Sequence, residues 1–133
     1  MNNNIAVIGI GSNINAAENI SEMLEILGRK VKILKVSQMI QTKPIGIEDQ
    51  PDYTNGAVKI ATPLERDELK KLLVSIEDEL GRDRSAVKYG PRTMDLDMIV
   101  WNGRIIDNDY YTRDFVRRSV QEVISSLSEE TGD

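Results

Sequence analysis

The sequence contains no cysteine and no histidine. The absence of cysteine excludes disulfide bonds, thiolate catalysis and cysteine-zinc sites. The absence of histidine excludes Ser-His and Cys-His catalytic arrangements, together with imidazole metal ligands. Any chemistry therefore falls to carboxylates, lysine, tyrosine and arginine.

Long apolar stretches are also missing. No run approaches the length of a membrane span, and residues 1–4, which precede a short apolar run, do not resemble a signal peptide. The formal net charge is -5 and the pI is near 4.8, which argues against nucleic acid as a partner. We therefore expect a cytoplasmic protein that has neither a membrane nor a nucleic-acid partner.

Hydrophobic periodicity predicts alternating strands and helices. Residues 5–10 form a continuous apolar run, which is typical of a strand buried on both faces. A helix is predicted from Asn15, as its N-cap, to Gly28, as its terminator. A second helix is predicted from a capping box at 62–65 as far as Gly81.

The remaining elements complete a recognisable order. Further strands are predicted at 31–36, 57–60 and 96–101. A C-terminal helix is predicted from the spacing of Val116, Val120, Val123 and Leu127. This order indicates an α+β fold of the ferredoxin-like, split βαβ type, an antiparallel sheet with helices packed on it. With 133 residues, we expect one domain over 1–127 and a polar, frayed tail over 128–133.

Two carboxylates and a cluster of cations are the candidate functional groups. Asp95 and Asp97 stand at the start of the predicted strand, so their side chains share one face and lie about 7 Å apart. Oxygen ligands at this spacing suit Mg²⁺, which often binds together with substrate phosphates. Four cations precede them: Arg82, Arg84, Lys88 and Arg92. The pattern indicates a site for a metal and a polyphosphate; arginines on a solvated surface loop are the alternative.

The segment from Thr42 to Asn55 is long for a loop in a compact domain. Its glycine and prolines are compatible with an ordered surface loop or with a mobile lid. Asn55 carries both donors and an acceptor, so it suits the edge of an amide-like ligand, although asparagines near turns often bond to the backbone instead.

Three motifs lie apart along the chain: Gly11-Ser12-Asn13, the Asp-Gln-Pro-Asp-Tyr segment at 49–53, and Gly90-Pro91-Arg92 followed by Asp95-Leu96-Asp97. Together they make the chain resemble the 6-hydroxymethyl-7,8-dihydropterin pyrophosphokinase family of folate biosynthesis. The resemblance spans nearly the whole chain and implies a ferredoxin-like fold. It also implies transfer of the β,γ-pyrophosphoryl group of ATP to the hydroxymethyl group of a reduced pterin.

The resemblance assigns roles to particular residues. Asp95 and Asp97 match the ligands of two Mg²⁺ ions that bridge the ATP phosphates, and Arg82 and Arg92 match cations that engage those phosphates during transfer. ATP-binding positions are matched by Glu77, Arg84, Tyr89 and Arg113. The pterin pocket is matched by Thr42, Ile45, Tyr53, Asn55 and Phe115. Transfer of this kind depends mainly on positioning and on cations that offset developing negative charge.

Several features depart from the family pattern. The Pro-His-Tyr-like stretch that usually follows the acidic strand is absent, the last helix ends early, and Lys43 and Val74 stand at positions where the family has other side chains. Two alternatives therefore stay open: a non-catalytic pterin- or nucleotide-binding paralogue, and a pyrophosphokinase for a related heterocycle or nucleotide. Phe115 is also compatible with a core position, and we expect a monomer or weak dimer.

Overall fold

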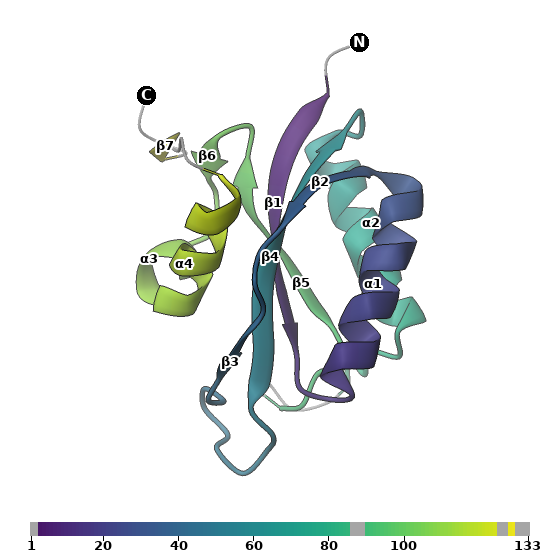
Figure 1. Ribbon diagram of the computed structural model, residues 1–133. Coiled ribbons are helices and arrows are strands. Elements are labelled where there is room, and N and C mark those ends of the chain that lie inside the picture. Colours follow the sequence, from purple (N-terminus) through teal and green to yellow (C-terminus); the bar gives the residue numbers. More distant parts are fainter. Residues whose placement is uncertain (1–2, 86–89, 125–127, 130–133) are drawn as a thin grey trace.

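The computed structural model describes residues 3–85, 90–124 and 128–129, the last two by their backbone (Figure 1). The elements are β1 (Asn4–Ser12), α1 (Ala16–Lys30), β2 (Lys32–Val36), β3 (Ile40–Thr42), β4 (Tyr53–Thr62), α2 (Arg66–Glu79), β5 (Asp95–Trp101), β6 (Arg104–Ile105), α3 (Asp109–Thr112), α4 (Asp114–Val123) and β7 (Ser128–Glu129). Helices cover both faces of one sheet. The predicted α+β class is confirmed.

The sheet has the strand order β2-β4-β1-β5-β6-β7, and β3 also pairs with β4. All of these pairings are antiparallel except the one between β6 and β7. The central strand β1 lies between β4 and β5, as the ferredoxin-like arrangement requires. The continuous apolar sequence of β1 therefore reflects burial on both faces, as predicted.

The two faces of the sheet carry separate hydrophobic cores. Ala6, Ile8 and Ile10 of β1 pack with buried residues of α1 and α2. Val7 points to the opposite face, where it packs with Val120 and other buried residues next to α3 and α4. Because side chains alternate along a strand, β1 contributes to both cores. Figure 1 shows α1 and α2 on one side of the sheet and α3 and α4 on the other.

Both long helices differ at their ends from the sequence prediction. The helix α1 continues through Gly28 to Lys30, and Asn15 adopts a left-handed conformation without a side-chain capping bond. The helix α2 begins at Arg66, because Glu65 and Glu68 form the capping box. The predicted cap at Thr62 is wrong because Thr62 still belongs to β4 and is fully buried.

The loop predicted from Thr42 to Asn55 is shorter in the structure, because both of its ends belong to strands. Thr42 of β3 pairs with Tyr53 of β4, so the segment forms the turn of a β-hairpin. The strand β4 therefore starts at Tyr53, four residues before the strand predicted at 57–60. The connection that remains, residues 43–52, is termed the β3–β4 loop below. The hairpin fixes the two ends of this loop at neighbouring positions.

The C-terminal part contains elements that the sequence did not predict. The short helix α3 precedes α4, and β6 lies beside β5. Within the segment assigned to a tail, Ser128–Glu129 form β7, while 130–133 lie outside the described residues. Leu127, the last predicted position of the C-terminal helix, also lies outside them; α4 ends at Val123.

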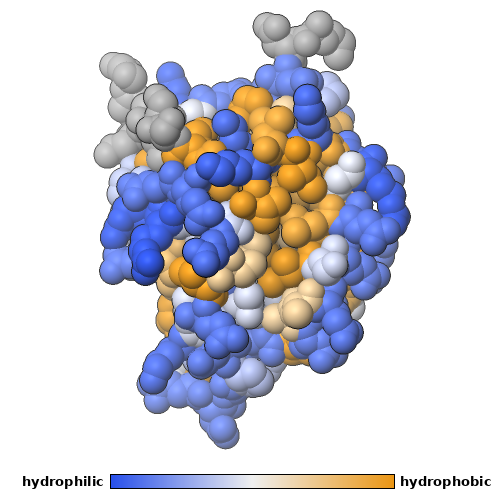
Figure 2. Space-filling view, viewed as in Figure 1, coloured by the Kyte–Doolittle hydropathy of each residue, from blue (hydrophilic) through white to orange (hydrophobic). Residues whose placement is uncertain are grey.

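The surface in Figure 2 is hydrophilic around its margin and carries a hydrophobic area in the middle of the view, over β2 and β4. Leu34 and Val36 of the edge strand β2 are exposed there. Lys32 and Lys35 on the same strand disfavour edge-to-edge pairing. No helix in the described part of the chain has the length and apolar character needed to cross a membrane.

Candidate active site

Gly9 and Gly11 on β1 lie between polar side chains of the two neighbouring strands. Gly11 pairs with Asn55 of β4 and with Asp95 of β5, while Gly9 pairs with Asp97. Directly paired side chains project from the same face of an antiparallel sheet. All three polar side chains therefore project from the face that carries α3 and α4, and the two glycines leave the space between them open.

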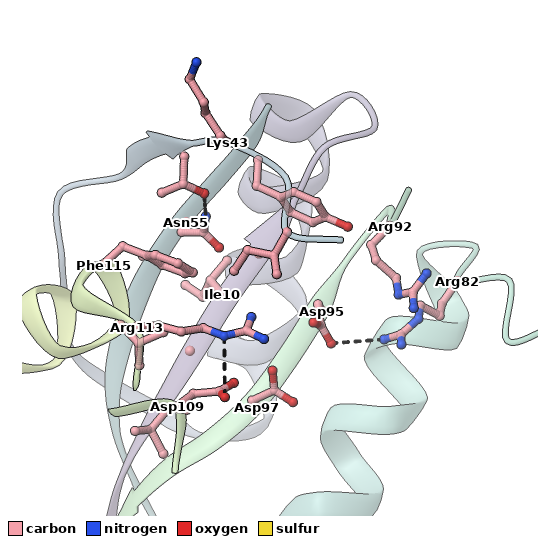
Figure 3. Close-up of a pocket in the computed structure, with 18 residues that line it drawn as sticks. Ile10, Lys43, Asn55, Arg82, Arg92, Asp95, Asp97, Asp109, Arg113 and Phe115 are labelled. Carbon is pink, nitrogen blue, oxygen red and sulfur yellow. Dashed lines mark hydrogen bonds and ion pairs between the residues drawn. The ribbon is translucent and has the colours of Figure 1, made fainter. Parts of the chain in front are cut away.

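A pocket of about 290 Å³ opens over these glycines (Figure 3). Its walls come from β1, the start of the β3–β4 loop, β4, β5, and the segment that contains α3 and the start of α4. The side chains that the sequence indicated and that line it are Thr42, Ile45, Tyr53, Asn55, Arg82, Arg92, Asp95, Asp97, Arg113 and Phe115. A volume near the lower end of the usual range for ligand pockets suits a small ring system.

One side of the pocket combines an amide with aromatic rings. The Asn55 side-chain nitrogen donates to the Thr42 hydroxyl at 2.5 Å, which fixes the orientation of the amide. Phe115 points from the start of α4 into the pocket beside Asn55 (Figure 3). The Tyr53 hydroxyl donates to the Gly90 carbonyl at 2.8 Å, and partial burial raises its pKa. This side can accept a flat ring with polar edges.

The opposite side of the pocket is acidic. Asp95 and Asp97 project next to each other from β5 (Figure 3). Removal from water raises the pKa of Asp97 to about 7, and repulsion from Asp95 and from more distant carboxylates adds to this. Asp97 remains open to the water in the pocket, which screens the repulsion in part. A cation bound between the two carboxylates would oppose this rise, because a neighbouring positive charge favours the ionised form of Asp97.

Arg82 holds the acidic side to the end of α2. Its Nη1 atom lies 3.2 Å from Asp95 Oδ1 and 3.1 Å from Glu77 Oε2. Glu77 is 4% exposed and also accepts a hydrogen bond from the backbone nitrogen of Leu96 at 2.7 Å. This buried carboxylate thus ties α2, the arginine and β5 together. The Nε atom of Arg82 is buried and has no hydrogen-bond partner among the residues that the structure describes.

A second cavity, of about 650 Å³, adjoins the first. Arg82, Asp95 and Asp97 line both cavities. The second one also has an apolar part: Leu73, Val74, Leu96, Met98 and Ile106. Arg84 stands at its border, where it donates to Glu77 Oε1 and to Asp78 Oδ1, both at 2.9 Å. The two cavities therefore share their charged wall, and the larger one has the space and the apolar surface for a nucleoside.

The segment after β6 adds charges to the pocket wall. Arg113 lies 3.6 Å from Asp109 through its Nε atom, and both side chains face the pocket (Figure 3). Asp107 accepts a hydrogen bond from the backbone nitrogen of Asp109 at 2.8 Å, and burial raises its pKa. The guanidinium of Arg113 is directed toward the acidic side, where it can meet an anionic ligand.

Comparison with known proteins identifies the family. Residues 7–125 match the model of the 7,8-dihydro-6-hydroxymethylpterin-pyrophosphokinase family. The chain belongs to this family. The 2-amino-4-hydroxy-6-hydroxymethyldihydropteridine pyrophosphokinase of Bacillus subtilis is 38% identical, over 96% of this chain and 83% of its own length. The enzyme of the same name from Haemophilus influenzae is 35% identical, over 92% of this chain and 82% of its own.

Membership of the family establishes the reaction class. The family transfers a pyrophosphoryl group from ATP to hydroxymethyldihydropterin in folate biosynthesis. The predicted family, fold and reaction are therefore confirmed. A relative in Arabidopsis thaliana, named a folate synthesis bifunctional protein, is 34% identical over 77% of this chain but over only 22% of its own length. The sequence of this family thus also occurs as part of larger proteins.

The structure brings most of the predicted site residues to these two cavities. Glu77 and Arg84 line the second cavity, and Glu77 acts there as a buried anchor. Tyr89, assigned to ATP binding, lies outside the described residues. The sequence prediction did not include Asp107 or Asp109. Their signal was present, because they repeat the acid-x-acid spacing of Asp95 and Asp97, but they follow a strand too short to predict.

Proposed function

We propose that the reaction of the family takes place across the shared wall of the two cavities. The pterin would lie over Gly9 and Gly11, with its polar edge against Asn55 and its ring beside Phe115. The ATP phosphates would lie along Asp95 and Asp97. The register that puts Asn55 and the two carboxylates on either side of the glycines carries this proposal, because it places a ring-binding group and a metal-binding pair within one pocket.

Two Mg²⁺ ions fit the acidic side on chemical grounds. Asp95 and Asp97 supply hard oxygen ligands. Removal from water, followed by repulsion from Asp95, raises the pKa of Asp97, and a divalent ion beside the two carboxylates would favour their ionised forms. The described residues contain no group of three or more acidic side chains arranged to hold a metal. The carboxylates would therefore bind the ions together with phosphate oxygens and water. Mg²⁺ bound there would draw negative charge from the phosphate oxygens.

The reaction requires one bond to form and one to break. The hydroxyl oxygen of the pterin forms a bond to the β-phosphorus, and the bond from this phosphorus to the α,β-bridging oxygen breaks. AMP leaves with that oxygen, and the hydroxyl loses its proton to water. Arg92 and Arg113 line the pocket at positions from which they can offset charge on the transferred group. No strong protein base is needed if the reacting atoms are held in line.

Arg82 would exchange its partner when the phosphates bind. In the structure it forms ion pairs with Glu77 and Asp95. A metal bound to Asp95 would compete with Arg82 for that carboxylate, which would leave the guanidinium available to a phosphate. Glu77 would keep the arginine near the site during the exchange. Arg84 stands at the second cavity and would assist there, next to the apolar part that we assign to the nucleoside.

The test is pterin-dependent formation of AMP. Purified protein is mixed with ATP, Mg²⁺ and 6-hydroxymethyl-7,8-dihydropterin, and AMP is quantified with and without the pterin. The proposal requires AMP only when both the pterin and Mg²⁺ are present, and its loss in Asp97→Ala. A folded protein that binds the pterin without forming AMP would instead indicate a binding paralogue, and turnover with GTP or another heterocycle would change the assigned substrates.

A further inference from the structure

Asp107 stands where the apolar and the acidic walls of the second cavity meet. It lines this cavity, and its neighbour Ile106 belongs to the apolar part. The Ile106 backbone nitrogen donates to the Ile99 carbonyl at 2.8 Å, which holds the segment against β5. Removal from water raises the pKa of Asp97, and repulsion from Asp95 and then from Asp107 adds to this. Asp107 thus borders both the apolar part assigned to the nucleoside and the carboxylates assigned to the phosphates.

One oxygen of the Asp107 carboxylate is used by the backbone. The side chain is half-buried, and its Oδ1 atom accepts a hydrogen bond from the Asp109 backbone nitrogen at 2.8 Å. This bond fixes the orientation of the carboxylate at the start of α3. The side chain forms no other hydrogen bond with the residues that the structure describes. Because a carboxylate has about four acceptor sites, most of them remain available to a ligand in the cavity.

The negative charge of Asp107 limits which part of a nucleotide it can meet. A carboxylate beside a phosphate is repelled unless a cation lies between them. Within the described residues no three acidic side chains are arranged to hold a metal, so Asp107 does not complete a metal site with Asp95 and Asp97. Ribose hydroxyl groups are neutral donors to a carboxylate. The ribose also joins the base to the phosphates, so it belongs at the border where Asp107 stands.

We propose that Asp107 is a specificity-determining residue that accepts hydrogen bonds from the ribose hydroxyl groups and favours ribonucleotides over deoxyribonucleotides. This inference rests on the proposed function, because it needs the nucleoside in the second cavity. A deoxynucleotide leaves the carboxylate without one of these donors, which weakens binding. The apolar part of the cavity cannot make this distinction, because the base is the same in both nucleotides.

Two substitutions separate this role of Asp107 from its role in the local turn. Asp107→Asn keeps an acceptor for the Asp109 backbone nitrogen but replaces the second oxygen by an amide nitrogen, which cannot accept a hydrogen bond. Asp107→Ser also keeps an acceptor for this nitrogen, because serine forms turns of the same kind, but it has no second oxygen. Both variants should therefore retain the start of α3.

Asp83 provides the matched control. Its Oδ1 atom accepts a hydrogen bond from the Ser85 backbone nitrogen at 2.9 Å, in the same pattern as Asp107 and Asp109. Asp83 is exposed and lines neither of the two cavities. Asp83→Asn and Asp83→Ser thus alter the same kind of turn without removing a carboxylate from the cavity. If Asp107 serves only its turn, its variants may lose stability but must keep the preference for ribose.

The experiment compares nucleotide binding in the absence of the pterin, so that no transfer occurs. Dissociation constants of ATP, 2′-deoxyATP and 3′-deoxyATP, each with Mg²⁺, are determined by calorimetry. We expect the unchanged protein and both Asp83 variants to bind at least one deoxynucleotide about tenfold more weakly than ATP. In Asp107→Asn and Asp107→Ser this difference should disappear, because the affinity for ATP falls to that for the deoxynucleotides. Urea unfolding checks that each variant is folded.

The outcomes separate this inference from the proposed function. Loss of the ribose preference in both Asp107 variants, with the preference kept in the Asp83 variants, supports the assignment. If the unchanged protein forms AMP but binds the three nucleotides equally well, the role assigned to Asp107 is wrong and the proposed function stands. The same holds if Asp107→Ser keeps the full preference, or if the Asp83 variants lose it equally. If the unchanged protein neither binds ATP nor forms AMP, the proposed function itself fails.

Discussion

The strand-borne side chains of the site are fixed differently from the arginines that face them. Asn55, Asp95 and Asp97 stand on strands paired with β1, so the backbone ladder sets their positions. Arg82 and Arg92 instead lie in the segment between α2 and β5. The position of Arg82 depends on side-chain ion pairs with Glu77 and Asp95. The groups that we assign to the ring and to the metal are thus fixed before binding, whereas the arginine can change partners.

This difference has a physical reason. A metal site and the edge of a ring need precise geometry, which paired strands supply. Negative charge that develops on the phosphates during transfer is better stabilised by arginines that can move from a carboxylate to a phosphate. A loop permits this movement because its side chains are less tightly packed than those of a strand. The following substitutions test the side chains on the strands and the arginines between α2 and β5 separately.

We expect the largest effect on catalysis from Asp97→Asn. The substitution keeps the shape of the side chain but removes one of the two charges assigned to the metal. The loss of an electrostatic group of this kind typically lowers kcat by about 10²- to 10³-fold. Steady-state formation of AMP checks this, with the exposed carboxylate of Glu22 on α1, changed in Glu22→Gln, as the control. Full activity of Asp97→Asn at ordinary Mg²⁺ concentrations would remove Asp97 from the metal site.

Glu77→Ala should strongly lower the free energy of unfolding, because Glu77 anchors the arginines of the segment between α2 and β5. It leaves Arg82 without one of its two carboxylates, removes a partner of Arg84, and leaves the Leu96 backbone nitrogen without its acceptor. Breaking a buried ion pair in this way costs about 3 to 5 kcal/mol. Urea unfolding measures the loss.

Asp78→Ala is the matched control for that substitution. Asp78 also binds Arg84, but its side chain is 55% exposed. Exposed pairs contribute about 1 kcal/mol or less, so the control should unfold almost as the unchanged protein does. Equal losses in the two variants would contradict the anchoring role of Glu77.

Gly11→Ala should weaken the binding of the pterin more than it affects stability. An added Cβ would lie 3.0 Å from the Asn55 side-chain oxygen, and the nitrogen of the same amide already donates to the Thr42 hydroxyl. The displaced amide should lower pterin affinity by about tenfold, or 1.4 kcal/mol. Alanine is less costly than glycine in a strand by about 0.5 to 1 kcal/mol, which offsets part of the strain.

The control for this prediction is Gly28→Ala in α1. The added Cβ would make an ordinary contact with Ile33 at 3.4 Å, far from the pocket, and alanine favours a helix. Pterin affinity, measured by calorimetry, should be unchanged in this variant. An unchanged affinity in Gly11→Ala would mean that Asn55 does not read the edge of the pterin.

The sequence predicted the parts of the fold that local patterns encode. The apolar run of β1 and the repeated leucines of α2 specified a central strand and an amphipathic helix. The ends were less predictable: Gly28 lies inside α1 because packing against the sheet outweighs the helix-breaking tendency of one glycine. The hairpin of β3 and β4 was missed because pairing between distant residues leaves little local signal.

The candidate site shows the same division. The spacing of Asp95 and Asp97 placed both carboxylates on one face, and the structure agrees. The resemblance added the pterin residues. Neither source indicated that Asn13 connects Gln50 with Arg92, since these contacts span 37 and 79 residues and depend on tertiary structure.

The smallest effect that we predict is a dependence of stability on pH. Asp97 has a pKa near 7 in the folded protein, above its ordinary value of 3.8. The folded state therefore holds this proton more tightly than the unfolded state does. The resulting stabilisation is complete below about pH 4 and is lost as the pH rises through 7. Water in the pocket reduces its size, so we expect a modest shift.

The comparison with Asp97→Asn isolates this contribution, because the other carboxylates titrate in both proteins. Unfolding midpoints in urea are measured at pH 5 and pH 8, with a chelator present to remove divalent ions. The unchanged protein should lose more stability between these values than Asp97→Asn does. Identical losses would mean that the carboxylate of Asp97 is already ionised at pH 5. Asp95 and Asp97 would then both carry a negative charge without a bound cation.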